Sequence, residues 1–161
     1  MPIMKKMLLF LLLTGALTST MQAQPGSELP RVFVLGEEEQ AYEQLTKDYS
    51  QSLLTACNYD MKAAFDKWLG MMQEMETYSE KINFDLKGIS VWFHVFWNTD
   101  GNIEHIGFLL RPNSRNVPKA EMAAFLTTFM RRYTFPVTSG QKFSHYTGAT
   151  FPTFSQRIGD D

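Results

Sequence analysis

Apolar and polar residues alternate along two neighbouring stretches of the chain, which is the pattern of strands in a sheet. The first stretch runs from Ile89 to Trp97, and the second follows Asp100-Gly101, a pair typical of tight hairpin turns. Two registers, one residue apart, fit this turn. We predict the register that collects the strongest apolar set on one face, in which Ile106, Phe108 and Leu110 lie behind Val91, Phe93 and Val95.

The opposite face of this hairpin is unusually apolar for a surface in contact with water. It carries Trp92, His94, Phe96, His105 and Leu109. Two interpretations remain open. In the first, helices from the first half of the chain cover Trp92 and Phe96, so that the sheet has helices on both sides. In the second, the face is a contact site for a partner, as large exposed apolar areas usually are.

Residues 37–82 show the three- and four-residue spacing of amphipathic helices. A first helix is marked by Tyr42, Leu45, Tyr49 and Leu53, and a break at Cys57-Asn-Tyr-Asp60 ends it. A second helix carries five large apolar residues on one face, which predicts either a core stripe or a soft, Met-rich groove for a partner: Met61, Phe65, Trp68, Met72 and Met75. We expect the two helices to form an antiparallel hairpin.

A third alternating run, from Lys142 to Phe151, follows a helix that lies between Pro118 and Pro136. The complete order predicts an α+β fold, with an N-terminal helical hairpin followed by a small antiparallel sheet packed against helices. We expect one compact unit over residues 24–161. Its predicted parts are an extended leader at 24–36, whose residues 31–35 form either a strand or a packed extended segment, the helical hairpin at 37–82, the sheet domain at 83–154 and a tail at 155–161.

The first 23 residues have the features of a cleaved secretion signal. Lys5-Lys6 precede an apolar run that is about half the roughly 20 residues needed to cross a bilayer, and Ala23 ends the predicted cleavage site. Cleavage would leave 13 basic against 17 acidic residues, a net charge of −4, which argues against a nucleic-acid partner. We therefore expect a periplasmic or secreted protein with no membrane span after cleavage. Its single cysteine, Cys57, excludes an intramolecular disulfide.

Three segments of the second half of the chain follow one another in a pattern of strand, tight turn, strand and helix. They are Val91-Trp-Phe-His-Val-Phe-Trp-Asn-Thr-Asp-Gly101, Asn102-Ile-Glu-His-Ile-Gly-Phe108 and the helix that ends at Tyr133-Thr-Phe-Pro136. With these segments the second half of the chain resembles the C-terminal domain of TonB-type energy transducers. Short motifs at residues 112–116 and 142–146 also resemble exported proteins of Bacteroidota that share this domain. The resemblance implies that the third strand offers its edge to a short peptide from an outer-membrane protein, by strand addition.

This resemblance implies a non-enzymatic protein-binding or adaptor module whose partner is an outer-membrane or periplasmic protein. A force-transmitting transducer would also need a membrane anchor and a long Pro-rich span, which we do not find. The candidate contact residues on the third strand are Phe143, His145, Thr147 and Ala149. Trp92 and Phe96 are candidates on the aromatic face, and Arg115 is a candidate for binding a carboxylate of the partner.

Reaction chemistry finds little support in the sequence, and we predict no cofactor. One histidine falls on each predicted strand, His94, His105 and His145, so a metal site is a weaker alternative. Ser144 and His145 are adjacent in a strand and point to opposite faces, so they cannot share a proton. A second alternative is a small ligand-binding α+β module, cystatin-like or nuclear-transport-factor-like, in which a helix packs on a curved sheet; five or six strands would favour it.

Overall fold

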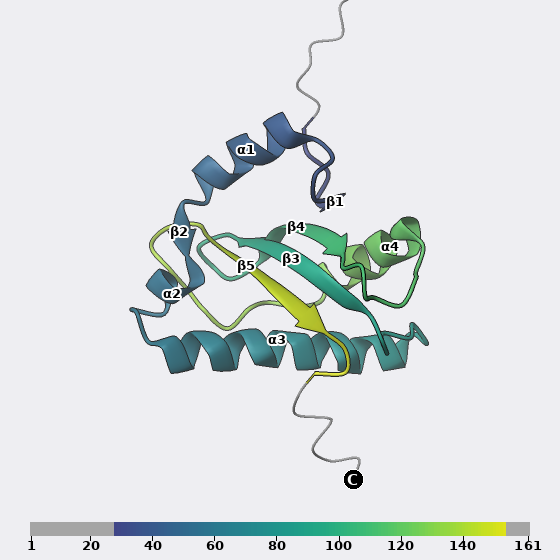
Figure 1. Cartoon of the computed structure of the whole chain (residues 1–161). Helices are drawn as coiled ribbons and strands as arrows, with labels where there is room; N and C mark the ends of the chain where they lie inside the picture. The colour runs from purple at the N-terminus through teal and green to yellow at the C-terminus, as the bar shows by residue number, and fades with distance from the viewer. Residues whose placement is uncertain (1–27, 154–161) are drawn as a thin grey trace, which may run out of the picture.

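The computed structural model describes residues 28–153. The predicted signal segment at 1–23, the first part of the leader and the tail at 155–161 lie outside the described residues. The chain folds around one five-stranded sheet with the strand order β1-β4-β3-β5-β2. The strands are β1 (Val32–Val34), β2 (Gln51–Ser52), β3 (Ser90–Trp97), β4 (Ile103–Leu110) and β5 (Phe143–Thr150). The helices are α1 (Glu39–Asp48), α2 (Leu53–Ala56), α3 (Met61–Lys81) and α4 (Lys119–Met130) (Figure 1).

The central hairpin of β3 and β4 has the predicted register. Val91 lies opposite Leu110, Phe93 opposite Phe108 and Val95 opposite Ile106, so the strongest apolar set is on one face. Gly101 closes the turn with a φ of 83°, a conformation that favours glycine. A side chain at this position would also collide with the backbone oxygen of Phe135, so the turn needs glycine for two reasons.

The prediction of an antiparallel sheet is wrong at both edges, because the sheet is mixed. The three long strands, β3, β4 and β5, are antiparallel, but β1 pairs parallel to β4 and β2 pairs parallel to β5. Both added strands come from the first half of the chain, where runs of three and two residues are too short to show an alternation. The segment 31–35, for which the sequence left two forms open, is therefore an edge strand over Val32–Val34.

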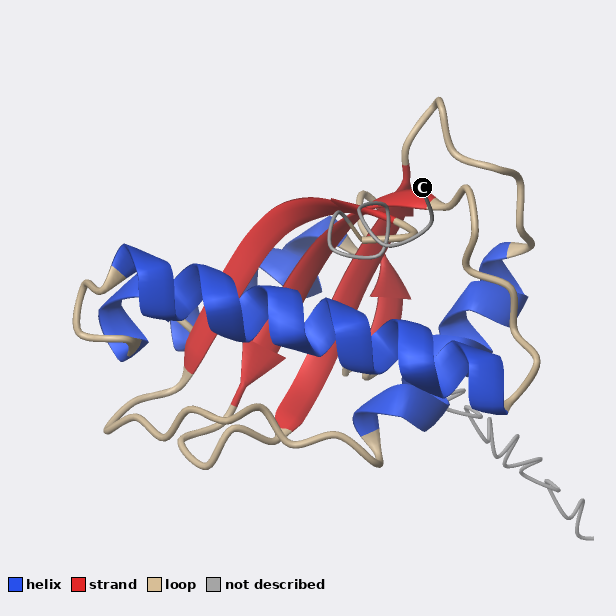
Figure 2. Ribbon diagram, turned by 90° about the horizontal axis from the view of Figure 1, so that it is seen from below, coloured by secondary structure: helices blue, strands red, loops and turns tan. Residues whose placement is uncertain are grey.

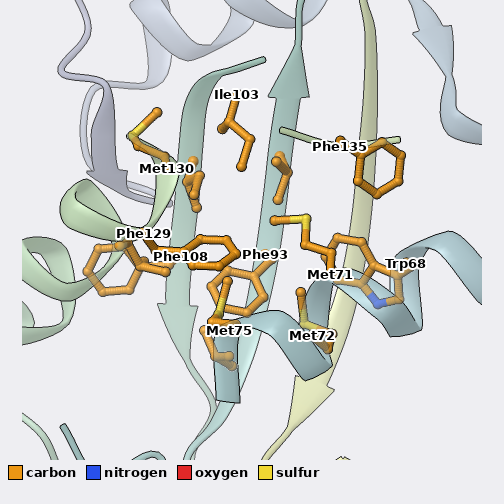
Figure 3. Packing of buried hydrophobic residues seen from close by; sticks show 14 of the residues in the cluster. Trp68, Met71, Met72, Met75, Phe93, Ile103, Phe108, Phe129, Met130 and Phe135 are labelled. Atoms are coloured by element: carbon orange, nitrogen blue, oxygen red, sulfur yellow. The ribbon is translucent and has the colours of Figure 1, made fainter. Parts of the chain in front are cut away.

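The main core lies on one face of the sheet, which we call the α3 face. There α3 crosses the curved strands obliquely, with α4 beside it (Figure 2). Methionines of α3 fill the space between helix and sheet, and Met71 and Met75 are fully buried against Phe93 and its neighbours (Figure 3). Asp60 caps the helix, since its side chain accepts a hydrogen bond from the backbone N–H of Ala63 at 2.9 Å.

The predicted antiparallel hairpin of helices at 37–82 does not form. α1 lies on the opposite face of the sheet, the α1 face, and α3 lies below it (Figure 1). Between them the chain passes the sheet as β2 and turns through α2, so that Leu53 belongs to α2 and not to the first helix. The physical reason is the aromatic α1 face, where Phe96 would be exposed without the cover of Tyr42, Leu45 and Tyr49.

The apolar stripe of α3 is core only in part. Trp68, Met72 and Met75 are buried as predicted, whereas Met61 is 68% and Phe65 61% exposed. These two residues lie in the first turns of the helix, ahead of the part that packs against the strands. Their exposure leaves apolar surface at the beginning of α3.

The strand count of five meets the criterion that favours the cystatin-like or nuclear-transport-factor-like alternative. A helix also lies across a curved sheet, as that alternative requires (Figure 2). Strand length points the other way, because β1 has three residues and β2 has two, while those folds need longer strands. Three strands of eight residues carry the sheet.

Candidate functional site

The outer side of β5 is the candidate site, because most of it has no neighbouring strand within residues 28–153. β2 pairs only with Phe143 and Ser144. Among residues 28–153, no strand pairs with the outer side of β5 from His145 to Thr150, and we call this side the open edge. Unpaired strand edges are templates for pairing with another chain.

The hydrogen-bond pattern identifies the residues whose backbone faces the open edge. The carbonyl of Ser90 accepts from Arg111 N–H on the β4 side, and the N–H of Phe151 donates to Ile89 on the opposite side. Backbone groups alternate in direction along an antiparallel strand. Val91, Phe93 and Val95 therefore bond to β5, through their partners Ala149, Thr147 and His145. The backbone groups of Tyr146, Gly148 and Thr150 point outward.

The four residues chosen from the sequence as strand-addition contacts thus have their backbone groups engaged with β3. Phe143 is fully buried, Ala149 packs against the core on the α3 face, and Thr147 is half-buried. His145 contacts Trp68 of α3, with ring centroids 5.0 Å apart. The outward set at Tyr146, Gly148 and Thr150 was missed, because side-chain alternation does not indicate which strand residues bond to which neighbour. The order of strands in the sheet decides this.

The open edge lacks the features that usually protect an edge strand. Residues 145–150 read His-Tyr-Thr-Gly-Ala-Thr, with no lysine, no carboxylate and no proline. Charges, prolines and bulges are the common means by which proteins prevent unwanted edge pairing. The one irregularity in register lies between Phe96 and Trp97 in the pairing with β4, away from β5. The edge is therefore regular and uncharged along six residues.

An exposed aromatic group lies above the open edge on the α1 face. Tyr146 is 52% exposed, and its ring stacks on Trp92 at a centroid distance of 5.7 Å and an interplanar angle of 7°. The guanidinium of Arg111 lies 5.0 Å from the centre of the Trp92 ring. Gly148 lies directly opposite Trp92 in the pairing of β3 with β5. A side chain there would approach the indole to 3.2 Å, so glycine leaves room for this ring.

The two aromatic candidates on the α1 face have different surroundings. Phe96 is fully buried, with Tyr49 in edge-on contact at 5.3 Å. Trp92 is half-buried and lies beyond the reach of α1. The helix therefore covers Phe96, as the first interpretation has it, whereas Trp92 remains partly accessible beside the open edge.

A polar chain under α1 joins Tyr42, His94 and Ser144. Tyr42 Oη lies 2.8 Å from His94 Nδ1, and His94 Nε2 lies 3.1 Å from Ser144 Oγ. Ser144 Oγ in turn donates to the carbonyl of Tyr49 at 3.3 Å. Every group is satisfied when Tyr42 donates to Nδ1 and Nε2–H donates to Ser144. In this tautomer His94 Nε2 carries a proton and cannot accept the one on Ser144, and the hydrogen bonds tie α1 to the sheet.

The electrostatics of His94 agree with this structural role. Burial, together with the charge of His145, lowers the pKa of His94 to about 4. The imidazole is therefore neutral at pH 7, as the hydrogen-bonding pattern requires. Burial also lowers the pKa of His145 on the other face of the sheet.

A second polar cluster holds the end of α1 to the sheet. Tyr49 donates a hydrogen bond to Glu104, and Lys142 Nζ lies 2.9 Å from the same carboxylate. Burial, the hydrogen bond to Glu104 and the negative charge of that carboxylate together raise the pKa of Tyr49 to about 12, although Lys142 acts in the opposite direction. Burial would also raise the pKa of Glu104, but the hydrogen bonds from Tyr49 and Lys142 outweigh it and hold that pKa below its usual value.

The three strand histidines do not come together. His94 and His105 lie on the α1 face, and His145 lies on the α3 face against Trp68. His105 Nδ1 lies 3.2 Å from the carbonyl of Pro30. Within the described range, no group of three or more His, Cys, Asp or Glu side chains is arranged to hold a metal ion. Cys57 is buried, and burial raises the pKa of its thiol, so the reactive thiolate is disfavoured.

Arg115 has partners within the chain. Its Nε donates to the carbonyl of Lys87 at 2.9 Å, and its Nη2 donates to the carbonyl of Asp85. The guanidinium also lies 3.8 Å from the Asp85 carboxylate. The sequence suggested that the Arg115 guanidinium binds a partner's carboxylate. In the structure its donors instead hold the loop at 85–87.

A pocket of about 560 Å³ lies at the C-terminal end of α3, next to the residues that follow β5. Its apolar lining comes from Phe84, Leu86, Phe151 and Pro152, while Glu80 and Asp85 add negative charge and Lys87 adds positive charge. Glu76 forms part of the wall and is 3% exposed. Its carboxylate accepts hydrogen bonds from the backbone N–H and the hydroxyl of Thr153, which follows β5.

Comparison with protein-family models, curated proteins and solved structures finds no match to this chain. Between residues 28 and 153, no helix combines the length and the apolar character that a membrane crossing requires.

Proposed function

We propose that this chain is a non-enzymatic, exported protein-binding or adaptor module that takes up an extended peptide of an outer-membrane or periplasmic protein along the open edge of β5. The observation that carries the proposal is the set of outward backbone groups at Tyr146, Gly148 and Thr150, for which residues 28–153 provide no partner strand. A peptide strand could exchange hydrogen bonds with each of them, while its alternate side chains meet the surfaces above and below.

The surroundings of the open edge support a neutral, partly aromatic or aliphatic peptide. Tyr146 and Trp92 provide an apolar surface on the α1 face, and residues 145–150 have no charge that would select a charged partner. The TonB-like resemblance and the secretion signal predicted from the sequence are consistent with a partner in the cell envelope.

The proposal is tested by a pair of variants that differ in one backbone donor. Tyr146→Pro removes an outward N–H, and Tyr146→Ala removes the same aromatic side chain but keeps that N–H. The full chain carrying a photo-crosslinker at Thr150 is incubated with envelope extract, and crosslinked peptides are mapped. We expect one extended segment to be crosslinked to the parent protein, less of it to Tyr146→Ala because part of the aromatic surface is lost, and at least about tenfold less to Tyr146→Pro than to Tyr146→Ala.

A crosslinker at Leu109 is the matched control, because this residue is exposed on the same face of the sheet but lies on β4. Equal crosslinking from Leu109 and Thr150, or capture that does not change in Tyr146→Pro, would contradict strand addition.

The pocket at the end of α3 favours a second candidate, a small-ligand binding module. Its volume and apolar lining suit a compact ligand, and its rim carries charges of both signs, Glu80 and Asp85 together with Lys87. The space between α3 and the centre of the sheet, where a cystatin-like or nuclear-transport-factor-like ligand site would be expected, is instead filled by Met71, Met75 and Phe93 (Figure 3). The open edge is therefore the better supported site.

A further inference from the structure

The open edge of β5 can pair with the same edge of a second copy of the chain. An antiparallel pairing that places Gly148 opposite Gly148 also places Tyr146 opposite Thr150, in both directions. All three residues with outward backbone groups then find partners, and each pair exchanges two hydrogen bonds. A two-fold axis at Gly148 relates the copies, which is the usual symmetry of dimers.

The ends of the edge limit this pairing to residues 146–150. At the beginning of β5 the outer position is taken by β2, which pairs with Phe143 and Ser144. After Thr150 the chain leaves the sheet through Phe151-Pro152, and Thr153 is held by Glu76 of α3. The stretch without a strand neighbour therefore matches the length that self-pairing needs. Residues 145–150 have no charge, so two copies meet there without repulsion.

Exposed apolar side chains lie beside the beginning of β5, on the α3 face. Phe65 and Met61 project from the first turns of α3. The contact of Trp68 with His145 shows that this part of the helix lies level with the beginning of β5. Phe65 lies on the side of α3 away from α4, because Tyr78, on the opposite side, stacks on Phe125 of α4. Phe65 shares a helix face with buried Met72, so its 61% exposure shows that residues 28–153 leave this face uncovered at the beginning of α3.

The pocket at the end of α3 lies on the same face, at the other end of β5. Phe151 and Pro152, which follow β5 directly, form part of its lining with Phe84 and Leu86. In an antiparallel pairing about Gly148, the beginning of β5 in one copy lies beside the end of β5 in the other. A two-fold axis perpendicular to the sheet also keeps the two α3 faces on the same side. The exposed Phe65 of each copy is thus brought toward the apolar pocket of the other.

We infer that two copies of this chain form a homodimer in which the β5 edges pair across Gly148 and Phe65 of each copy docks at the pocket of the other. The inference rests on the proposed function in one respect, because the envelope peptide and the second copy of the chain would use the same open edge. The dimer is then a closed form of the binding module, and a peptide can enter only when the copies separate. Peptide uptake therefore depends on protein concentration.

The test is the mass of the purified full chain, measured by light scattering and sedimentation over a series of concentrations. We expect a monomer–dimer equilibrium for the parent protein. Phe65→Lys and Tyr146→Lys should each raise the dissociation constant by about 100-fold or more, since each dimer contains two copies of the lost contact. Leu109→Lys makes a comparable change on the same sheet away from the edge and should leave the dimer unchanged.

The register has its own measurement. In a Cys57→Ala background, the double variant Tyr146→Cys with Thr150→Cys should be linked into covalent dimers by a short thiol-specific reagent, and Leu109→Cys should not. A monomer at every concentration, a dimer that Phe65→Lys does not weaken, or a failure of this crosslink would overturn the inference.

Failure of this inference can be told apart from failure of the proposed function. Phe65→Lys leaves every residue of the open edge in place. If the parent protein is monomeric but still captures the envelope peptide, only the second-copy inference fails. If Phe65→Lys is monomeric and captures no peptide, the inference stands and the proposed function fails.

Discussion

Phe93 and Trp92 are neighbours in β3, yet they belong to two different kinds of surface. Phe93 points to the α3 face, is fully buried and packs with Trp68, Met71 and Met75 beneath two helices. Trp92 points to the α1 face, where the single helix α1 reaches Phe96 but not Trp92. The comparison shows that stability is concentrated on the face that two helices cover, and accessibility on the face that one helix covers in part.

The largest expected effect comes from removing Phe93 on the α3 face. Phe93→Ala leaves a cavity among side chains that cannot close over it, and we expect the free energy of unfolding to fall by about 3–5 kcal/mol. Denaturation in urea, followed by circular dichroism, measures the change. A loss below about 1 kcal/mol would show that the α3 face is not the principal core.

The next largest effect is the dependence of stability on pH, which we expect from His94 in the hydrogen-bonded series under α1. The pKa of His94 is about 4 in the folded state, below its ordinary value of 6.5, so the unfolded state binds a proton first as the pH falls. Stability is therefore fully present above pH 6.5 and decreases between pH 6.5 and about 4. The loss from His94 is on the order of 3 kcal/mol. His145, whose pKa is also lowered, contributes in the same direction.

Thermal unfolding across this pH range, in parent and His94→Gln proteins, tests the assignment. Glutamine retains a polar group beside Tyr42 and Ser144 but cannot titrate, so the variant should lose most of the pH dependence. The companion variant His145→Gln measures the share of the second histidine. If the stability of His94→Gln depends on pH in the same way as that of the parent protein, the buried imidazole of His94 is not the source of the pH dependence.

The sequence predicts the packing of the α3 face better than that of the α1 face, and the reason is physical. The register of β3 against β4 was predictable, because an apolar set as strong as Val91, Phe93 and Val95 can be buried together in only one of the two registers. The position of α1 was not, since Tyr42 and Leu45 would suit a helical partner as well as Phe96. Spacing along a helix indicates that a face is buried and does not identify what buries it.

The candidate site was predicted at the level of the strand but not of the residues. An alternating run at Lys142–Phe151 was sufficient to place a third strand and to propose its edge. The choice of Phe143, His145, Thr147 and Ala149 followed side chains, whereas the open edge is defined by the backbone of the residues between them. Which residues of β5 direct their backbone groups outward depends on two contacts between segments far apart in the sequence. β3 pairs with one side of β5, and β2 pairs with the other side but ends at Ser52.

The smallest expected effect on stability comes from Trp92, and it sharpens the comparison with its neighbour. Trp92→Ala removes the stacking with Tyr146 and the contact with Arg111, but it opens no cavity in the main core. We expect a loss of about 1–2 kcal/mol in urea denaturation, well below that of Phe93→Ala. Binding of the envelope peptide should fall at least about tenfold at the same time, because the surface above the open edge is lost. A loss of stability as large as that of Phe93→Ala would place Trp92 in the core. Unchanged peptide capture by Trp92→Ala would show that the peptide contacts the backbone of the open edge and not the aromatic surface above it.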